Sequence, residues 1–188
     1  LVPCAENSVS GSAYRPGDVV THYGGTTTEV SNTDAEGRMV LADALAYAVD
    51  TLAPDLLVDV ATLTGAMKVA LGLRTGGLFA TTDELAQRIS TAGAQVGERW
   101  WRMPLLAEHA EAVQSELADL RQGPPGPGGI TAALFLREFT SGSPWAHLDI
   151  AGPARAEQAY DEVAPVATGF AARTLVELAR GLAQVSPR

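Results

Sequence analysis

Residues 31–45 read SNTDAEGRMVLADAL and combine two signals in one short segment. Asp34 and Glu36 are carboxylates two positions apart, and Arg38 follows them at the start of an amphipathic helix. Hard divalent cations prefer carboxylate oxygens, and a two-metal hydrolytic centre needs carboxylates that can bridge two ions. We therefore consider Asp34 and Glu36 candidate metal ligands.

Arg38 occupies a position where a cation is disfavoured, because the N-terminal end of a helix carries a partial positive charge. An anion held there by the guanidinium and the helix amides would explain its presence. The alternative is a capped helix start with acidic residues in its first turn and a solvated arginine. For an Asp-x-Glu-x-Arg motif taken alone, this structural interpretation is the commoner one.

The segments around this stretch predict alternating helices and strands. Apolar residues on one face predict a helix over about 37–52, with Leu41, Leu45, Ala48 and Leu52 inward and Pro54 ending it. The apolar run 56–63 is typical of a buried strand, and 76–81 of a shorter one. Upstream, the β-prone runs 18–22 and 27–30 flank Gly24-Gly25 and indicate a hairpin or a loop.

The second half of the chain continues the pattern. We expect helices over 83–97 and 105–120 separated by a turn at 100–104, and then a loop at 123–129. A helix over about 130–140, a strand over 146–150 and a closing helix over about 169–183 follow. The fold class predicted is α/β, with a central mostly parallel or mixed sheet flanked by helices and incomplete at its N-terminal side. We expect one domain over residues 1–188.

Composition excludes several classes of function. The chain has 188 residues, 13 Lys and Arg against 22 Asp and Glu, and a net charge of −9. This balance argues against a nucleic-acid partner, which needs clustered cations. No run approaches the ~20 apolar residues of a membrane span. The single Cys4 cannot form an internal disulfide, so we expect it to be a small packed residue and the protein to be cytoplasmic.

Other chemistry-bearing side chains have simpler interpretations. The three histidines lack the spacing of metal ligands, and one of them lies within an apolar strand, where a hydrogen-bonded core histidine is expected: His22, His109 and His147. Asp59 and Asp149 belong to predicted strands, so we expect them to satisfy backbone amides or a cation. The tryptophans indicate packing or a subunit contact.

The segment 32–38 resembles the signature of the leucyl (cytosol) aminopeptidase family. Other strings agree with that family in order and spacing: 1–3, 5–7, 14–18, 59–66, 128–133, 145–152 and 167–170. The resemblance implies a metal-dependent aminopeptidase that removes bulky apolar, leucine-like residues from the N-terminus of peptides. It implies two divalent ions, Mn²⁺ or Zn²⁺, with Asp34 and Glu36 as ligands and Arg38 as the catalytic holder of an anion such as bicarbonate.

The same resemblance assigns substrate-binding positions to Thr62, Leu63, Gly65, Ala151 and Ala154, and it implies a homohexamer with peptide substrates and no membrane partner. Family members also take a Lys, two Asp ligands and a catalytic Lys from an upstream segment. This chain is therefore expected to be a partial catalytic domain that carries part of the site. There are two alternatives. The chain could be an inactive fragment or remnant with a structural role, or it could be a module that binds anions or peptides.

Overall fold

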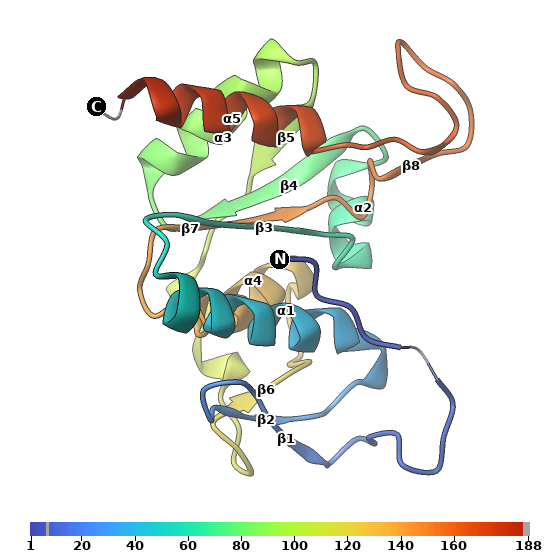
Figure 1. The fold of residues 1–188 in the computed structure, drawn as a ribbon. Helices are drawn as coiled ribbons and strands as arrows, with labels where there is room; N and C mark the ends of the chain where they lie inside the picture. The colour runs from blue at the N-terminus through green and yellow to red at the C-terminus, as the bar shows by residue number, and fades with distance from the viewer. Residues whose placement is uncertain (7, 186–188) are drawn as a thin grey trace. The chain divides into compact units, whose positions relative to one another are not determined.

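The computed structural model describes residues 1–6 and 8–185 (Figure 1). The contacts group them into two compact units. Unit 1 comprises Leu1–Leu57 with Leu105–Pro144, and unit 2 comprises Val58–Pro104 with Trp145–Arg188. The single domain expected over the whole chain stays a prediction. Among the described residues, no helix combines the length and the apolar character needed to cross a membrane.

Unit 1 contains a small three-stranded sheet. Strand β1 (Val19–Thr21) pairs antiparallel with β2 (Thr27–Glu29), and β2 pairs parallel with β6 (Leu120–Arg121). The connection between β1 and β2 turns at Gly24 and Gly25, whose φ angles of 86° and 96° suit glycine. The predicted hairpin is confirmed.

Helix α1 (Glu36–Tyr47) follows the short 3₁₀ helix η1 (Thr33–Ala35) and continues as one π-helical segment, η2 (Ala48–Leu52). The predicted helix is confirmed, and it ends at Ala53 in the left-handed conformation, just before Pro54. Leu52, however, is 58% exposed, so its predicted inward position is wrong. The wider π turn rotates the last residues away from the face that the α-helical period predicts.

Helix α4 (Gly128–Arg137) packs against α1 in unit 1 and is almost wholly buried. His22, in the β1–β2 connection, contacts both regions. Its ring packs edge-on against Phe139, just after α4, with 4.8 Å between the ring centroids. His22 Nδ1 lies 2.9 Å from Asp43 Oδ1 on α1, and Nε2 lies 3.0 Å from the hydroxyl of Thr28. This histidine is a buried packing residue.

The helix predicted over 105–120 is wrong. Two 3₁₀ turns, η3 (Ala107–His109) and η4 (Glu111–Val113), and the strand β6 occupy this segment. The Ser115 hydroxyl donates to the Glu29 carboxylate at 2.5 Å, and the Asp119 carboxylate accepts the Thr27 N–H at 2.8 Å. These long-range bonds compete with a local helix and bring Leu120 alongside β2.

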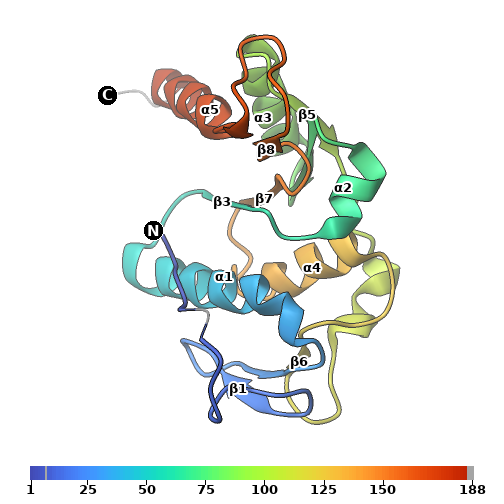
Figure 2. The same ribbon diagram turned by 90° about the vertical axis from the view of Figure 1, so that its right-hand side faces the viewer.

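Unit 2 is built on a four-stranded mixed sheet in the order β3 (Leu57–Ala61), β7 (Trp145–Asp149), β4 (Thr75–Ala80) and β5 (Arg99–Arg102). Strand β4 is antiparallel to β7 and parallel to β5. Helix α2 (Gly65–Leu71) follows β3, and α3 (Asp83–Gln95) packs against α5 (Ala172–Val185) (Figures 1 and 2). The small hairpin β8 (Arg155–Ala156) and β9 (Val166–Ala167) completes the unit, and the predicted mixed α/β class is confirmed.

The turn predicted at 100–104 is also wrong, because residues 99–102 form the edge strand β5. The Trp100 ring covers Gly76 on β4 and Gly93 on α3, and a Cβ at either glycine would collide with it. Its indole N–H donates to the Thr174 hydroxyl at 2.9 Å. The strand forms because its neighbours leave room for this ring.

Candidate functional site

In unit 1, the segment 31–38 forms a short 3₁₀ turn that leads directly into α1. Asn32 caps the turn, since its side-chain oxygen accepts the Asp34 N–H at 3.0 Å. Asp34 and Glu36 follow within the turn and at the first residue of α1, and both are exposed. The two candidate ligands therefore stand on a backbone with a defined, capped geometry.

Gln122 holds this segment from the other side, although it lies 84 to 90 residues further along the chain. Its side chain is fully buried; its carbonyl oxygen accepts the Asn32 N–H at 3.2 Å and its amide donates to the Ala35 carbonyl at 2.9 Å. Sequence reasoning missed Gln122. One polar residue before a Gly- and Pro-rich loop carries no signal of such a role.

Arg38 is buried, in contrast to the solvated arginine of the alternative interpretation. Its Nη1 donates to the Gln122 backbone carbonyl at 2.6 Å, so the guanidinium is oriented by the same residue that holds the turn. Nearby, burial and, to a smaller extent, the negative charge of Glu36 raise the pKa of Tyr14. The predicted role of Arg38 in binding an anion stays a prediction.

The candidate ligands match the predicted pair of divalent ions only in part. Asp34 and Glu36 match such ions in chemistry, because both offer hard oxygen ligands. Within residues 1–6 and 8–185, however, no three His, Cys, Asp or Glu side chains gather in a way that could hold a metal. The described residues therefore match the metals in chemical kind but supply no complete set of ligands.

In unit 2, the predicted substrate-binding residues lie after two strands of the sheet. Thr62, Leu63 and Gly65 follow β3, and Ala151 and Ala154 follow β7. Gly65 is exposed at the first residue of α2, and an added Cβ there would meet nothing within 4 Å. Backbone at this position is open to an approaching ligand.

The carboxylate of Asp149, the last residue of β7, joins these two segments. Its Oδ1 accepts the Leu63 N–H at 3.2 Å and the Ala151 N–H at 3.1 Å. Its Oδ2 accepts the Thr64 N–H at 3.0 Å and the Thr64 hydroxyl at 2.7 Å. The expectation that Asp149 satisfies backbone amides is confirmed, and the structure brings Leu63 and Ala151 together within unit 2.

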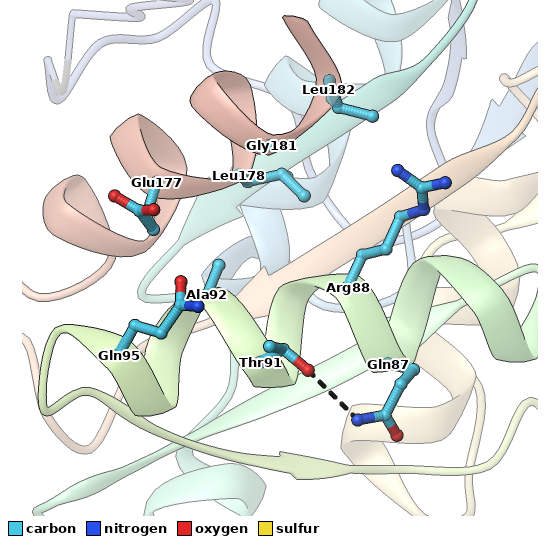
Figure 3. Close-up of a pocket in the computed structure, with 9 residues that line it drawn as sticks. All are labelled: Gln87, Arg88, Thr91, Ala92, Gln95, Glu177, Leu178, Gly181 and Leu182. Atoms are coloured by element: carbon cyan, nitrogen blue, oxygen red, sulfur yellow. Dashed lines mark hydrogen bonds between the residues drawn. The ribbon is translucent and has the colours of Figure 1, made fainter. Parts of the chain in front are cut away.

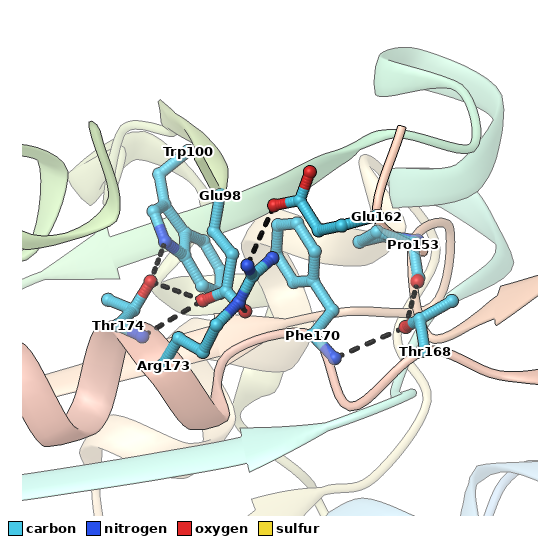
Figure 4. A network of polar contacts seen from close by, with 8 residues as sticks. All are labelled: Glu98, Trp100, Pro153, Glu162, Thr168, Phe170, Arg173 and Thr174. Atoms are coloured by element: carbon cyan, nitrogen blue, oxygen red, sulfur yellow. Dashed lines mark hydrogen bonds and ion pairs between the residues drawn. The ribbon is translucent and has the colours of Figure 1, made fainter. Parts of the chain in front are cut away.

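Thr168 forms hydrogen bonds to residues 153 and 154, in the segment that follows β7 (Figure 4). Its hydroxyl donates to the Pro153 carbonyl at 2.6 Å and accepts the Phe170 N–H at 3.2 Å, while its own N–H donates to the Ala154 carbonyl at 3.1 Å. Residues 153 and 154 are thus bonded to the loop between β9 and α5.

Figure 4 also shows a buried acid that the sequence did not reveal. Glu98 accepts the N–H and hydroxyl of Thr174 at 3.0 and 2.5 Å, and Arg173 lies 3.6 Å from its other oxygen. Arg173 also bonds Glu162 at 2.8 Å, and this bond lowers the pKa of Glu162 and raises that of Arg173. This network anchors the start of α5 and contains no predicted site residue.

Three further expectations can be compared with the structure. His147 is a buried core residue as predicted, with Nδ1 2.5 Å from the Asp59 carboxylate, which also accepts the Trp145 indole N–H at 2.7 Å. Cys4 is exposed, so the prediction of a packed cysteine is wrong; residues 1–6 all lie on the surface. Trp101 is exposed, whereas Trp145 is buried.

A groove of about 280 Å³ lies between α3 and α5 (Figure 3). Its wall includes Leu178 and Gly181 of α5 and Gln87 of α3, whose amide donates to the Thr91 hydroxyl at 3.1 Å. None of the predicted site residues lines this groove. It is a helix–helix crevice of unit 2.

Comparison with known proteins gives consistent matches. A profile described as "Cytosol aminopeptidase family, catalytic domain" matches residues 1–176. A probable cytosol aminopeptidase of Chlorobium phaeobacteroides is 51% identical over 180 residues, which is 95% of this chain and 36% of that protein. One from Picosynechococcus is 52% identical over 172 residues, 91% of this chain and 35% of that protein.

Solved structures agree with these matches. The bottromycin maturation enzyme BotP is similar with a TM-score of 0.86 and 50% identity, covering 93% of this chain and 39% of that one. BotP in complex with Mn gives a TM-score of 0.85 over 92% of this chain and 39% of that one. A mutant of tomato leucine aminopeptidase gives 0.85 and 44% identity, covering 92% and 34%. This chain spans about 36% of the length of the curated relatives it matches.

Proposed function

We propose that this chain, which belongs to the cytosol aminopeptidase family, supplies part of the active site of a metal-dependent aminopeptidase. The observation that carries the proposal is the pair of exposed carboxylates, Asp34 and Glu36, on a turn that Asn32 caps and Gln122 holds. Exposed acidic side chains on a turn that is held in one geometry are better explained by cation binding than by contact with solvent alone.

In this proposal, Asp34 and Glu36 contribute two of the ligands of a pair of divalent ions, Mn²⁺ or Zn²⁺. The further ligands would come from residues outside this chain, because its described part supplies no larger donor cluster. Such ions lower the pKa of bound water and polarise a peptide carbonyl. The Mn-bound relative supports manganese as one candidate.

Arg38 would orient an anion, such as bicarbonate, that serves as the general base. Its bond to the Gln122 carbonyl directs the guanidinium, and a guanidinium carries five N–H donors, so one such bond is compatible with binding an anion as well. We assign Arg38 an orienting role, and therefore expect its loss to cost less activity than loss of a metal ligand.

Unit 2 would recognise the N-terminal residue of a peptide. The backbone of Thr62 and Leu63 would face the substrate, while Gly65, Ala151 and Ala154 would line the pocket for its side chain. Small residues at these positions leave room for a bulky apolar group such as leucine. Location in the cytosol, which the names of the relatives support, is part of the same proposal. Assembly as a homohexamer is proposed with it and rests on the family resemblance alone.

The test measures amine release from a leucyl chromogenic substrate, with Mn²⁺ or Zn²⁺ added. It compares this chain with any longer polypeptide that contains it. Turnover by the longer form alone supports the proposal with this chain as part of the site. Absence of turnover from both would refute it and favour a structural role. Tight anion binding without metal uptake would favour a binding module instead.

A further inference from the structure

The buried carboxylate of Asp149, at the end of β7, accepts four hydrogen bonds. Each of its oxygens accepts two bonds, which is the full capacity of a carboxylate, and the residue is 1% exposed. A saturated carboxylate has no acceptor site left for a metal ion. All four donors belong to two segments, 63–64 and 151, that carry predicted substrate-binding residues.

A single atom connects the two segments. Oδ1 of Asp149 accepts from Leu63 and from Ala151, so the backbones at these residues are held at a set spacing. Oδ2 accepts hydrogen bonds from both the N–H and the hydroxyl of Thr64. The same hydroxyl caps α2 by accepting the Met67 N–H at 3.4 Å. The carboxylate therefore controls where β3 ends, where α2 begins and where the chain leaves β7.

Two other contacts hold the backbone of residues 151–154 in place. A Cβ on Gly152 would collide with the Gly72 carbonyl at the end of α2, so the two backbones touch there. Thr168 bonds the carbonyls of Pro153 and Ala154. Together with Asp149, these contacts hold residues 151–154 against the start and the end of α2.

We propose that Asp149 is the positioning residue that sets the spacing between the substrate-facing backbone at Leu63 and the pocket wall at Ala151, and thereby the selectivity of the pocket for the N-terminal side chain. This inference rests on the proposed function. A pocket discriminates between apolar side chains by its volume, and a displaced wall changes that volume. Asp149 acts through the backbone and touches no reacting group.

Asp59 provides a matched control. It is also a buried strand aspartate of the same sheet, but its partners are the side chains of Trp145 and His147. If burial of a carboxylate were the only role, Asn in place of either aspartate would have the same kind of effect. If Asp149 positions the pocket, the two substitutions differ.

The experiment compares Asp149→Asn with Asp59→Asn in an active polypeptide that contains this chain. Values of kcat/KM are measured for leucyl and alanyl substrates. For Asp149→Asn we expect the leucine-over-alanine preference to fall about tenfold, mainly through KM for the leucyl substrate. For Asp59→Asn we expect a lower melting temperature with the preference retained. An unchanged preference in active Asp149→Asn, or an equal change in Asp59→Asn, overturns the proposal.

A second pair covers the case in which Asp149→Asn does not fold. Thr64→Val removes one donor to the carboxylate, and Thr64→Ser keeps it. We expect a smaller loss of preference in Thr64→Val and its recovery in Thr64→Ser. Equal effects of Val and Ser contradict the proposal.

Amide hydrogen exchange gives a readout that does not depend on activity. In Asp149→Asn the amides of Leu63, Thr64 and Ala151 should exchange faster together, while in Asp59→Asn they should keep their protection. If the parent polypeptide shows no aminopeptidase activity, the proposed function fails. Exchange that is unaltered at these three amides refutes the positioning role itself.

Discussion

Two buried polar side chains, Gln122 in unit 1 and Asp149 in unit 2, hold the backbone of the segments that carry the candidate site residues. Each bonds to two backbone groups of a segment more than 80 residues away in sequence. A buried backbone donor without a partner costs about 1–3 kcal/mol. These residues therefore set the backbone geometry of the segments that carry the candidate site residues.

Glu36 is the residue whose loss tests the metal site most directly. In an active polypeptide containing this chain, Glu36→Gln should lower both metal content and turnover by orders of magnitude, because an amide is a weak, neutral ligand for a hard cation. Metal content is measured by mass spectrometry of the purified protein. Glu84→Gln, an exposed and ion-paired glutamate of α3, is the control and should retain both. Full metal occupancy and a near-normal rate in Glu36→Gln would contradict the assignment.

Ala154 tests the pocket. Ala154→Phe would fill space beside the segment that Asp149 and Thr168 hold, so preference should shift from leucyl toward alanyl substrates by about tenfold or more. The measurement is the ratio of kcat/KM values for the two substrates. Ala172→Phe, at an exposed position on α5, controls for added bulk. A specificity profile equal to that of the parent would rule out Ala154 as a pocket wall.

At the scale of elements, the contact of α3 with β5 depends on a glycine. A Cβ at Gly93 would collide with the Trp100 ring and lie 2.6 Å from the Glu98 carbonyl. Gly93→Ala should therefore destabilise the protein by about 1–3 kcal/mol, although alanine favours helices. Gly181→Ala on α5 is the control, because its added Cβ meets nothing within 4 Å, and it should stabilise by about 0.5–1 kcal/mol. Urea denaturation measures both, and a stabilised Gly93→Ala would contradict the packing.

The stability of the region where β2, η4 and β6 meet should depend on pH in the acid range. The Ser115 hydroxyl, and then Arg121, hold the pKa of Glu29 below its usual 4.5. Because the folded pKa is the lower one, the stabilisation is complete above about pH 5 and is lost as the pH falls through the folded pKa. The melting temperature of Glu29→Gln should lie below that of the parent at neutral pH, and the difference should narrow in acid. A difference independent of pH would show that the Glu29 charge contributes nothing.

At the scale of the whole molecule, charge predicts a lack of affinity for polyanions. With 13 basic against 22 acidic residues, the chain should repel a phosphate backbone. We expect no retention on a heparin resin at low salt, where a basic binding surface would be retained most strongly. Retention that weakens as salt rises would reveal a basic surface that the net charge conceals.

Sequence patterns located most elements of the chain and failed where distant partners decided the structure. The apolar periodicity of α1 and the apolar runs of β3 and β7 are local, and these elements formed close to the predicted bounds. Residues 105–120 have a helical pattern, yet bonds from Ser115 and Asp119 to β2 prevent a helix. Trp100 lies in a strand because glycines of two other elements make space for its ring.

The sequence by itself determined the α/β class, the family and the segments that carry the candidate site, because these depend on local periodicity and on one continuous motif around Asp34, Glu36 and Arg38. Only the tertiary structure revealed Gln122 and Glu98, and only it showed that Asp149 joins Leu63 to Ala151. Such roles arise from hydrogen bonds between residues some 75 to 90 positions apart. No local pattern encodes them, because the partners meet only when the chain has folded.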